Sequence, residues 1–240
     1  MIELEHVVKK FGDLLAVDDL SLKVGRNEFF AVLGPNAAGK TTTMKILAGL
    51  MKPTSGRVRI AGFDIQEQPL QARRRMAFVP DFPFLYEKLT PREFFRFIGQ
   101  LFHMTEAQLQ TNVGELIARF NLEPFADKAI DGLSHGTRQR VAIVSALLHD
   151  PEVFIIDEPM VGLDPQHARV VKDILKERAR AGMAVLLSTH QLSVAEEMAD
   201  RIGIMHHGRL IAVGTRDELR RKSGEAGPLE DVFLALTKNG

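Results

Sequence analysis

The stretch GPNAAGKTT at residues 34–42 constrains the fold of this chain more than any other part of its sequence. It matches the pattern G-x-x-x-x-G-K-[ST], in which a glycine-rich turn joins a buried strand to a helix. Backbone N–H groups of such a turn surround phosphate oxygens, the lysine reaches the outer phosphates, and the following hydroxyl ligates Mg²⁺. The predicted phosphate-binding residues are Gly34, Pro35, Asn36, Ala37, Ala38, Gly39, Lys40, Thr41 and Thr42.

Strand and helix patterns around this loop indicate an α/β fold. Strand-like segments are expected at 2–9, 21–24, 29–33, 57–61, 153–156, 184–188, 202–205 and 209–213. The runs at 153–156 and 184–188 are continuously apolar, which is typical of parallel strands buried on both faces. Helices are expected at 40–50 and 168–181, and helical spacing dominates from about 73 to 148. We therefore predict a P-loop NTPase core with a mostly parallel sheet, an N-terminal antiparallel β region and an inserted helical subdomain.

Length and composition favour one domain. The chain has 240 residues, 45% of them apolar, which is enough for a core of its own. We expect a catalytic core at residues 1–80 and 150–220, a helical subdomain at about 81–149 and a C-terminal helix at 221–240. Basic and acidic residues are equal in number, 31 each, so we expect no nucleic acid as a partner. The absence of cysteine excludes disulfides and thiolate metal sites.

Two adjacent acids follow the buried run VFII. Asp157 is placed to bind Mg²⁺ through its water shell, and Glu158 to polarise a water that attacks a γ-phosphate. The next buried run, LLST, is followed directly by His190, which is placed to hydrogen-bond the γ-phosphate. We predict Glu158, His190 and Lys40 as catalytic residues, and Thr41 and Asp157 as metal ligands.

LSHGT at residues 133–137 precedes a helix-like run and is not needed to hold the first nucleotide. Asp157 lies 117 positions after Lys40, far more than a simple crossover needs, and LSHGT lies at the end of this insertion. Free amides at a helix N-terminus, with a serine beside them, favour phosphate. We therefore predict that Ser134 and Gly136 bind phosphate, and that two chains associate head to tail so that each offers this edge to the other's nucleotide.

Together these motifs resemble the nucleotide-binding domain of ABC transporters, and the resemblance covers essentially the whole chain. It implies ATP and Mg²⁺ as ligands, and a dimer with a second copy or a homologous ATPase subunit. It also implies that LSHGT corresponds to the family's LSGGQ signature, which contacts the γ-phosphate across the dimer. Asp164, in GLDP, resembles the D-loop residue at the facing dimer surface, and Phe11 resembles the aromatic residue that stacks on adenine.

Four positions depart from the family pattern. His135 and Thr137 replace the usual Gly and Gln of the signature, and Ala37 replaces a common Gly of the phosphate-binding loop. Asp81, in VPDFP, stands where the family has the Gln of its Q-loop. Either Asp81 approaches the metal directly, or repulsion from Glu158 and the phosphates keeps it out. We retain Asp81 as a candidate metal ligand whose role depends on the partner.

Eight of the sixteen aromatic residues lie between residues 78 and 102. From their helical spacing, the apolar residues Phe94, Phe97 and Leu101 of this stretch are expected in the core of the helical subdomain. The apolar residues at 82–86 lie among prolines in a loop, and aromatic loops anchor partners well. In the family this region receives the coupling helix of the membrane subunit. The resemblance therefore implies permease subunits that dock on the 80–90 loop and are coupled to the nucleotide through Asp81.

The stretch LYEKLTPREFF and the SHG form of the signature resemble exporter-type ATPases of the ABC-2 group. The resemblance implies an ATP-hydrolysing subunit at the cytoplasmic face of the cell membrane, which drives separate membrane-spanning chains. Uptake of small polar solutes is the alternative within the same class. A soluble ABC protein acting on DNA or ribosomes generally needs long coiled-coil insertions or two such domains in one chain. A P-loop kinase would need an acceptor site and a lid in place of Glu158 and LSHGT.

Overall fold

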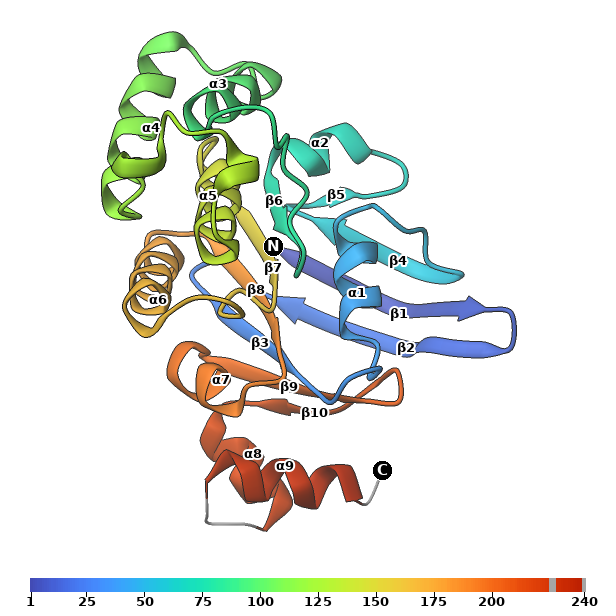
Figure 1. The fold of residues 1–240 in the computed structure, drawn as a ribbon. Coiled ribbons are helices and arrows are strands. Elements are labelled where there is room, and N and C mark those ends of the chain that lie inside the picture. The colour runs from blue at the N-terminus through green and yellow to red at the C-terminus, as the bar shows by residue number, and fades with distance from the viewer. Residues whose placement is uncertain (225–227, 239–240) are drawn as a thin grey trace.

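Two β-sheets and the helices around them make up the protein, of which the computed structural model describes residues 1–224 and 228–238 (Figure 1). The smaller sheet is antiparallel and has the strand order β2-β1-β4-β5. Its strands are β1 (Ile2–Phe11), β2 (Leu14–Val24), β4 (Ser55–Ile60) and β5 (Phe63–Asp64). Ile2 pairs with Val24 on one side and with Ile60 on the other. The predicted N-terminal antiparallel region is thus confirmed.

The larger sheet has the order β10-β9-β3-β8-β7-β6 and is parallel except for the edge pair β9 and β10. Its strands are β3 (Phe29–Leu33), β6 (Met76–Val79), β7 (Val153–Asp157), β8 (Ala184–Thr189), β9 (Arg201–His206) and β10 (Arg209–Gly214). Every residue of β3, β7 and β8 is buried, as expected for parallel strands covered on both faces. The predicted mostly parallel sheet is also confirmed.

Helices fill the connections between these strands. They are α1 (Lys40–Leu47), α2 (Pro69–Arg74), α3 (Pro91–Leu101), α4 (Glu106–Arg119), α5 (His135–Leu147), α6 (Pro165–Arg180), α7 (Leu192–Met198), α8 (Arg216–Ser223) and α9 (Leu229–Lys238). Two 3₁₀ turns, Glu123–Phe125 and Ile130–Gly132, join α4 to α5. The helices α3, α4 and α5 form the insertion between β6 and β7 (Figure 1). Among the described residues no helix combines the length and the apolar character needed to cross a bilayer.

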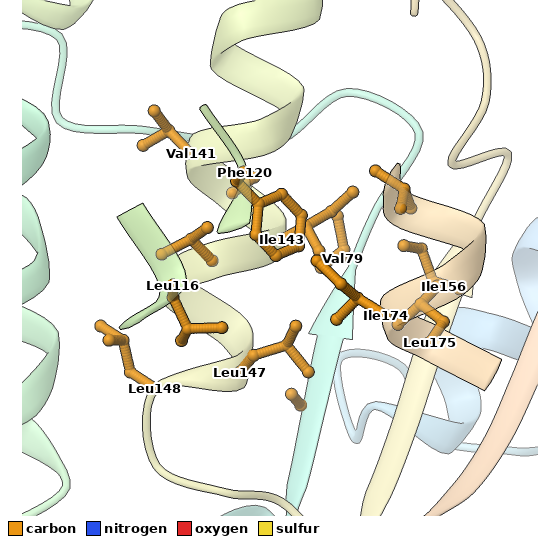
Figure 2. Close-up of a cluster of buried hydrophobic side chains, with 14 of the residues drawn as sticks. Val79, Leu116, Phe120, Val141, Ile143, Leu147, Leu148, Ile156, Ile174 and Leu175 are labelled. Carbon is orange, nitrogen blue, oxygen red and sulfur yellow. The ribbon is translucent and has the colours of Figure 1, made fainter. Parts of the chain in front are cut away.

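The helical insertion is packed firmly on the parallel sheet. Figure 2 shows side chains of α4, α5 and α6 meeting those of β6 and β7 in one buried cluster. Leu116 comes from α4, Ile143 from α5 and Ile174 from α6, and they surround Val79 and Ile156 of the two strands. Because interiors are close-packed and transmit strain, this cluster fixes the position of α5 relative to the end of β7.

Several element boundaries differ from the prediction. The helix expected at 40–50 ends at Leu47, because Gly49 adopts a positive φ of 66° and closes the helix. The strand expected at 21–24 begins at Leu14. Residues 76–79 form strand β6 inside the stretch expected to be helical from 73 onward. Four apolar residues are too few to show a period, and β6 is defined by its pairing with β7.

The C-terminal part contains two helices where one was predicted at 221–240. The first, α8, begins at a capping box of Thr215 and Glu218 and stops at Gly224, which has a φ of 75°. The second, α9, begins at Leu229 and is amphipathic. Of the predicted helix, residues 225–227 and 239–240 lie outside the described residues. A left-handed glycine ends a helix, so α8 stops at Gly224, and α9 lies inside the predicted range 221–240.

Candidate active site

A cavity of about 600 Å³ lies over the phosphate-binding loop. It is lined by Phe11, Leu14, Leu15, Ala16, Asn36, Ala37, Ala38, Gly39, Lys40, Thr41, Thr42, Asp81, Phe82, Glu158, Val161, His190, His207 and Gly208. The structure therefore brings together residues predicted from five separate stretches of the sequence. Leu14, Leu15 and Ala16 of β2 and the turn between β9 and β10 were not predicted, because nothing in their local sequence indicates contact with a ligand.

The phosphate-binding loop is held in its shape by backbone conformation and close packing. Gly39 has a φ of 101° and Ala37 has a φ of 64°. A side chain at Gly39 would collide with the carbonyl of Ala16 and the side chain of Met205. The loop therefore needs glycine at position 39 for two reasons, and Ala37 tolerates the left-handed conformation at some cost in strain.

Lys40 is folded back onto its own loop. Its Nζ donates hydrogen bonds to the carbonyl oxygens of Gly34 at 2.7 Å and Pro35 at 3.1 Å. Burial lowers the pKa of the Lys40 ammonium, and the nearby charges of Glu158 and Asp157 oppose that shift. Among the described residues, the hydrogen-bond partners of this buried ammonium are neutral carbonyls, which favours the approach of an anion such as a phosphate.

Thr41 and Asp157 meet beside Lys40. The Thr41 hydroxyl donates to Oδ2 of Asp157 at 2.9 Å. Asp157 ends strand β7 and is 1% exposed. Its other oxygen, Oδ1, is buried and has no hydrogen-bond partner among the residues that the structure describes. A buried carboxylate oxygen without a partner is costly, so this pair is suited to a cation or to ordered water.

Glu158 and His190 are hydrogen-bonded to each other. Oε1 of Glu158 accepts from Nδ1 of His190 at 2.8 Å, and Oε2 accepts from the hydroxyl of Thr189 at 3.1 Å. Glu158 has a φ of 48° directly after β7, a strained conformation of the kind that clusters at active sites. Thr189 was not predicted, although it immediately precedes His190 in the sequence.

Asp81 lines the same cavity as a third carboxylate. Burial raises the pKa of Asp81, the negative charges of Asp157 and Glu158 raise it further, and His135 and His190 oppose the shift. Asp81 is therefore close enough to both acids to feel their charge. Asp81 thus lies at the wall of the cavity, and both predictions for it, approach to the metal or exclusion by Glu158 and the phosphates, stay open.

Phe11 lies at the rim of the cavity, at the end of β1, and is 45% exposed. The ammonium of Lys9 is 5.0 Å from its ring centroid. A half-exposed aromatic ring beside a phosphate-binding loop offers a flat surface on which a base can stack. The neighbouring Leu14 is exposed as well, so this end of the cavity is apolar.

Ser134 begins helix α5 and does not line the cavity, within the part of the chain that the structure describes. The N-cap side chain of Ser134 accepts a hydrogen bond from the backbone N–H of Thr137 at 3.3 Å. Gly136 lies against the carbonyl of Gly162, which a side chain at position 136 would strike. The predicted second phosphate site is thus separate from the first within one chain.

Asp164 caps the N-terminus of α6. Its Oδ1 accepts from the backbone N–H groups of Gln166 and His167, both at 3.1 Å, and its Oδ2 contacts Nδ1 of His167 at 2.5 Å. These hydrogen bonds from His167, the side chain first, lower the pKa of Asp164. In a single chain, Asp164 is therefore occupied with its own helix, and it does not line the cavity in the described structure.

Comparison with known proteins identifies this arrangement. The family model described as ABC transporter matches residues 17–161. The daunorubicin resistance ATP-binding protein DrrA3 of Streptomyces coeruleorubidus is 36% identical over 97% of this chain and 73% of its own length. The linearmycin resistance ATP-binding protein LnrL of Bacillus subtilis is 32% identical over 100% of this chain and 76% of its own length.

Solved structures agree with these relatives. An ATP-binding subunit of an ABC transporter superposes with a TM-score of 0.94 at 34% identity, covering 98% of this chain and 99% of that chain. The dimeric ATP-binding cassette MJ0796, in a post-hydrolysis state with ADP and Pi, superposes with a TM-score of 0.82 at 28% identity over 90% of this chain and 98% of that chain. The chain therefore belongs to the ABC transporter family and is one of its ATP-hydrolysing cassettes.

Proposed function

We propose that this chain binds and hydrolyses ATP in a head-to-tail dimer, with a second copy or a homologous subunit, and thereby drives separate membrane-spanning subunits for export. One observation carries the dimer: Ser134 and Gly136, at a helix N-terminus suited to phosphate, lie outside the cavity formed by their own chain's phosphate-binding loop. A second chain in head-to-tail orientation brings the two half-sites together. The related cassette MJ0796 is dimeric in its solved structure, which supports this arrangement.

In the proposed reaction, Glu158 is the general base. It polarises the water that attacks the γ-phosphate, and the hydrogen bonds from His190 and Thr189 hold its carboxylate in place. Each oxygen of Glu158 keeps further acceptor capacity for that water. Lys40 exchanges the carbonyls of Gly34 and Pro35 for phosphate oxygens and stabilises their charge.

The other nucleotide contacts follow the shape of the site. The loop Gly34, Pro35, Asn36, Ala37, Ala38 and Gly39, with Thr42, surrounds the phosphates, and the ring of Phe11 stacks on the adenine. Asp164 and the Ser134–Gly136 edge of one chain complete the nucleotide site on the phosphate-binding loop of the other chain.

The residues present fit Mg²⁺. This ion keeps several waters and is bound through one or two carboxylates together with substrate phosphates. Thr41 and Asp157 would hold it, since Oδ1 of Asp157 is buried and unpartnered, and Asp81 offers a further carboxylate on the cavity wall. When bound, the ion supplies positive charge that neutralises the phosphates.

We propose that the membrane subunits dock on the 80–90 loop. Phe82 and Phe84 are 80% and 87% exposed, and Tyr86 is 51% exposed. Beside them an apolar groove of about 210 Å³ is bordered by β6, α3, the end of α5 and residues 83–85. Asp81 lies one residue before this surface and also lines the nucleotide cavity, so a partner helix seated here is mechanically linked to the nucleotide.

The expected apolar residues of the subdomain divide between core and surface. Phe94 is buried and Phe97 partly so, but Leu101 is 58% exposed, and its assignment to the core was wrong. Leu101 is the last residue of α3, where the helix leaves the core.

The names of the relatives support export. Besides the two resistance proteins, the Nod factor export ATP-binding protein I of Cupriavidus metallidurans is 38% identical over 91% of this chain and 72% of its own length. We propose that this chain is peripheral to the cytoplasmic face of the membrane. We also assign residues 1–80 and 150–220 to the catalytic core, about 81–149 to the helical subdomain and 221–240 to a C-terminal segment.

A complementation experiment tests the head-to-tail dimer. Lys40→Ala removes the phosphate-binding lysine, and Ser134→Arg blocks the helix N-terminus of α5. Each variant alone should have no measurable turnover, because every site lacks one half. A mixture should regain turnover, since each mixed dimer contains one site with an intact Lys40 and an intact Ser134. A mixture as inactive as its components would disprove the shared site.

The docking surface has its own test. Phe84→Ser should abolish transport by the full complex while leaving ATP turnover of the isolated chain within about twofold, because Phe84 does not support the core. Leu70→Ser, at another exposed apolar position on α2, is the matched control and should transport normally. Normal transport by Phe84→Ser would place the membrane subunits elsewhere.

A further inference from the structure

A chain of three polar side chains lies behind the predicted phosphate-binding edge of α5. The hydroxyl oxygens of Ser134 and Thr137 are 2.9 Å apart, and Nη2 of Arg140 donates to Oγ1 of Thr137 at 3.2 Å. The backbone N–H of Thr137 also donates to Oγ of Ser134, at 3.3 Å. The three side chains are thus linked in series, with Ser134 exposed at the outer end.

The chemistry of these groups gives the series a direction. A guanidinium has only donors, so Oγ1 of Thr137 accepts from Arg140. The one proton of the Thr137 hydroxyl is then free to donate to Oγ of Ser134. With the Thr137 hydroxyl as the donor of this pair, Oγ of Ser134 accepts two hydrogen bonds, one from that hydroxyl and one from the N–H of Thr137. Its own proton remains unused and is available to an acceptor outside the chain.

Burial separates the two inner residues of the series from solvent. Thr137 is 3% exposed and Arg140 is 4% exposed. The hydrogen-bond acceptors of Arg140 in the described structure are neutral, namely the carbonyls of Phe120 at 2.7 Å and Asn121 at 3.1 Å, and Oγ1 of Thr137. Its Nε is buried without a partner. A buried cation held by neutral groups favours negative charge nearby and keeps Thr137 as an acceptor.

We propose that Thr137 and Arg140 are positioning residues that orient the Ser134 hydroxyl as a hydrogen-bond donor toward the terminal phosphate of ATP bound by the other chain. This inference rests on the proposed head-to-tail dimer. It assigns a role to Thr137, which the resemblance left open: Thr137 is buried behind Ser134 and acts through it. Arg140, which the sequence analysis did not single out, supplies the fixed donor that begins the series.

The experiment compares Thr137→Val with Thr137→Ser. Valine keeps the volume and removes the hydroxyl, so the Ser134 proton loses its orientation, whereas serine keeps the hydroxyl. Thr137→Val should lower turnover about tenfold and weaken ATP-dependent dimerisation about tenfold, the size expected for one hydrogen bond to a charged group. Thr137→Ser should stay within about twofold of the unmodified chain. ATP binding to the single chain should be unchanged in both, which a general folding defect would not allow.

Two further variants test whether Thr137 acts through Ser134. Thr111→Val removes an exposed hydroxyl that donates within α4 to Ala107, and it should change nothing. If Thr137 acts through Ser134, the double variant Ser134→Ala with Thr137→Val should turn over no more slowly than Ser134→Ala alone. Equal dimerisation by Thr137→Val and the unmodified chain would overturn the inference, as would an additional loss in the double variant.

The outcomes also separate this inference from the proposed function. If the unmodified chain forms no ATP-dependent dimer, by itself or with a homologous subunit, the head-to-tail dimer itself is wrong. If the unmodified chain dimerises and Thr137→Val dimerises equally well, the dimer stands and only the orienting role of Thr137 fails. Sedimentation of both proteins with ATP, at a range of protein concentrations, distinguishes the two cases.

Discussion

The protein has two places suited to phosphate, and they are built in different ways. The loop at residues 34–42 is shaped by backbone conformation, and its side chains Lys40 and Thr41 hydrogen-bond to Gly34 and Asp157 of the same chain. The N-terminus of α5 lies on the helical insertion, and the Ser134 hydroxyl there is hydrogen-bonded to Thr137, which in turn accepts from the buried Arg140. The first place lies in a cavity lined by its own chain, whereas Ser134 is exposed and does not line that cavity in the described structure.

This difference indicates that the two places contribute differently to nucleotide binding. We expect a site made of backbone amides and strand ends to bind ATP without help from another chain. A site made of one exposed helix end has too few groups to hold a nucleotide alone, but it can complete a site held by another chain. Substitutions in or beside the loop at residues 34–42 (the loop side) should therefore alter ATP binding or hydrolysis in each chain. Substitutions at the N-terminus of α5 (the α5 side) should act only through the dimer.

The largest effect is expected for Glu158→Gln. Loss of the general base should lower turnover by roughly 10²–10⁴-fold, while ATP binding persists and the dimer accumulates because hydrolysis no longer releases it. The measurement is phosphate release alongside size analysis with ATP. Glu152→Gln, which alters an acid paired with Arg26 and Arg75 near the other end of β7, should keep most of the activity. Undiminished hydrolysis by Glu158→Gln would remove Glu158 from the mechanism.

Ser134→Arg tests the N-terminus of α5, the second place suited to phosphate. A bulky cation at the N-terminus of α5 should lower turnover at least about 10²-fold, because it disrupts the assembled site and opposes the helix dipole. ATP affinity of the single chain, measured by titration at high dilution, should stay within about twofold, since Ser134 does not line that cavity. Loss of ATP binding by the single chain would show that Ser134 acts on the nucleotide of its own chain.

We expect the stability of the fold to depend on pH through His149, next to the C-terminal end of α5. It follows α5, its ring stacks on Phe102 with centroids 3.6 Å apart, and its Nε2 contacts the carbonyl of Met76. Burial lowers the pKa of His149 from 6.5 to about 4, against the opposing effects of that carbonyl and of Asp150. The unfolded chain takes up a proton below pH 6.5 and the folded chain does not.

The stabilisation from keeping His149 neutral is therefore complete above pH 6.5, declines as the pH falls, and is lost near pH 4. The loss amounts to roughly 3 kcal/mol. His149→Phe keeps a stacked ring and removes the titration, so urea unfolding of this variant should show a smaller decline over that interval. Equal declines in both proteins would mean that the histidine is protonated without penalty.

The smallest effect is expected for Asp81→Asn on the loop side. Burial, Asp157 and Glu158 raise the pKa of Asp81 above 3.8, so its charge destabilises the nucleotide-free fold at neutral pH. Removing that charge should raise the melting temperature by about 2 °C at pH 8. The gain should shrink as the pH falls through the raised pKa and vanish below the ordinary one. Asp127→Asn, which removes an exposed partner of Arg92, should bring no such gain.

Much of the loop side was predictable because its chemistry is local in the sequence. The motif at 34–42 determines its own turn, and the acids at 157 and 158 directly follow a buried strand, so their place at a strand end needs no tertiary information. The cavity residues on β2 and on the turn after β9 could not be predicted in this way. They come from distant strands, and only the pairing of β3 with β9 and the packing of β2 carry them to the loop.

The sequence by itself determined the phosphate-binding loop, the two acids after β7, the parallel and antiparallel regions and the family, because short motifs and buried strand patterns depend on neighbouring residues. Tertiary structure alone decided that β6 is a strand, that Asp81 lies beside Asp157 and Glu158, and that Thr137 lies buried between Ser134 and Arg140. These features depend on which side chains meet across elements. Their energies come from burial and from paired hydrogen bonds, which no local pattern records.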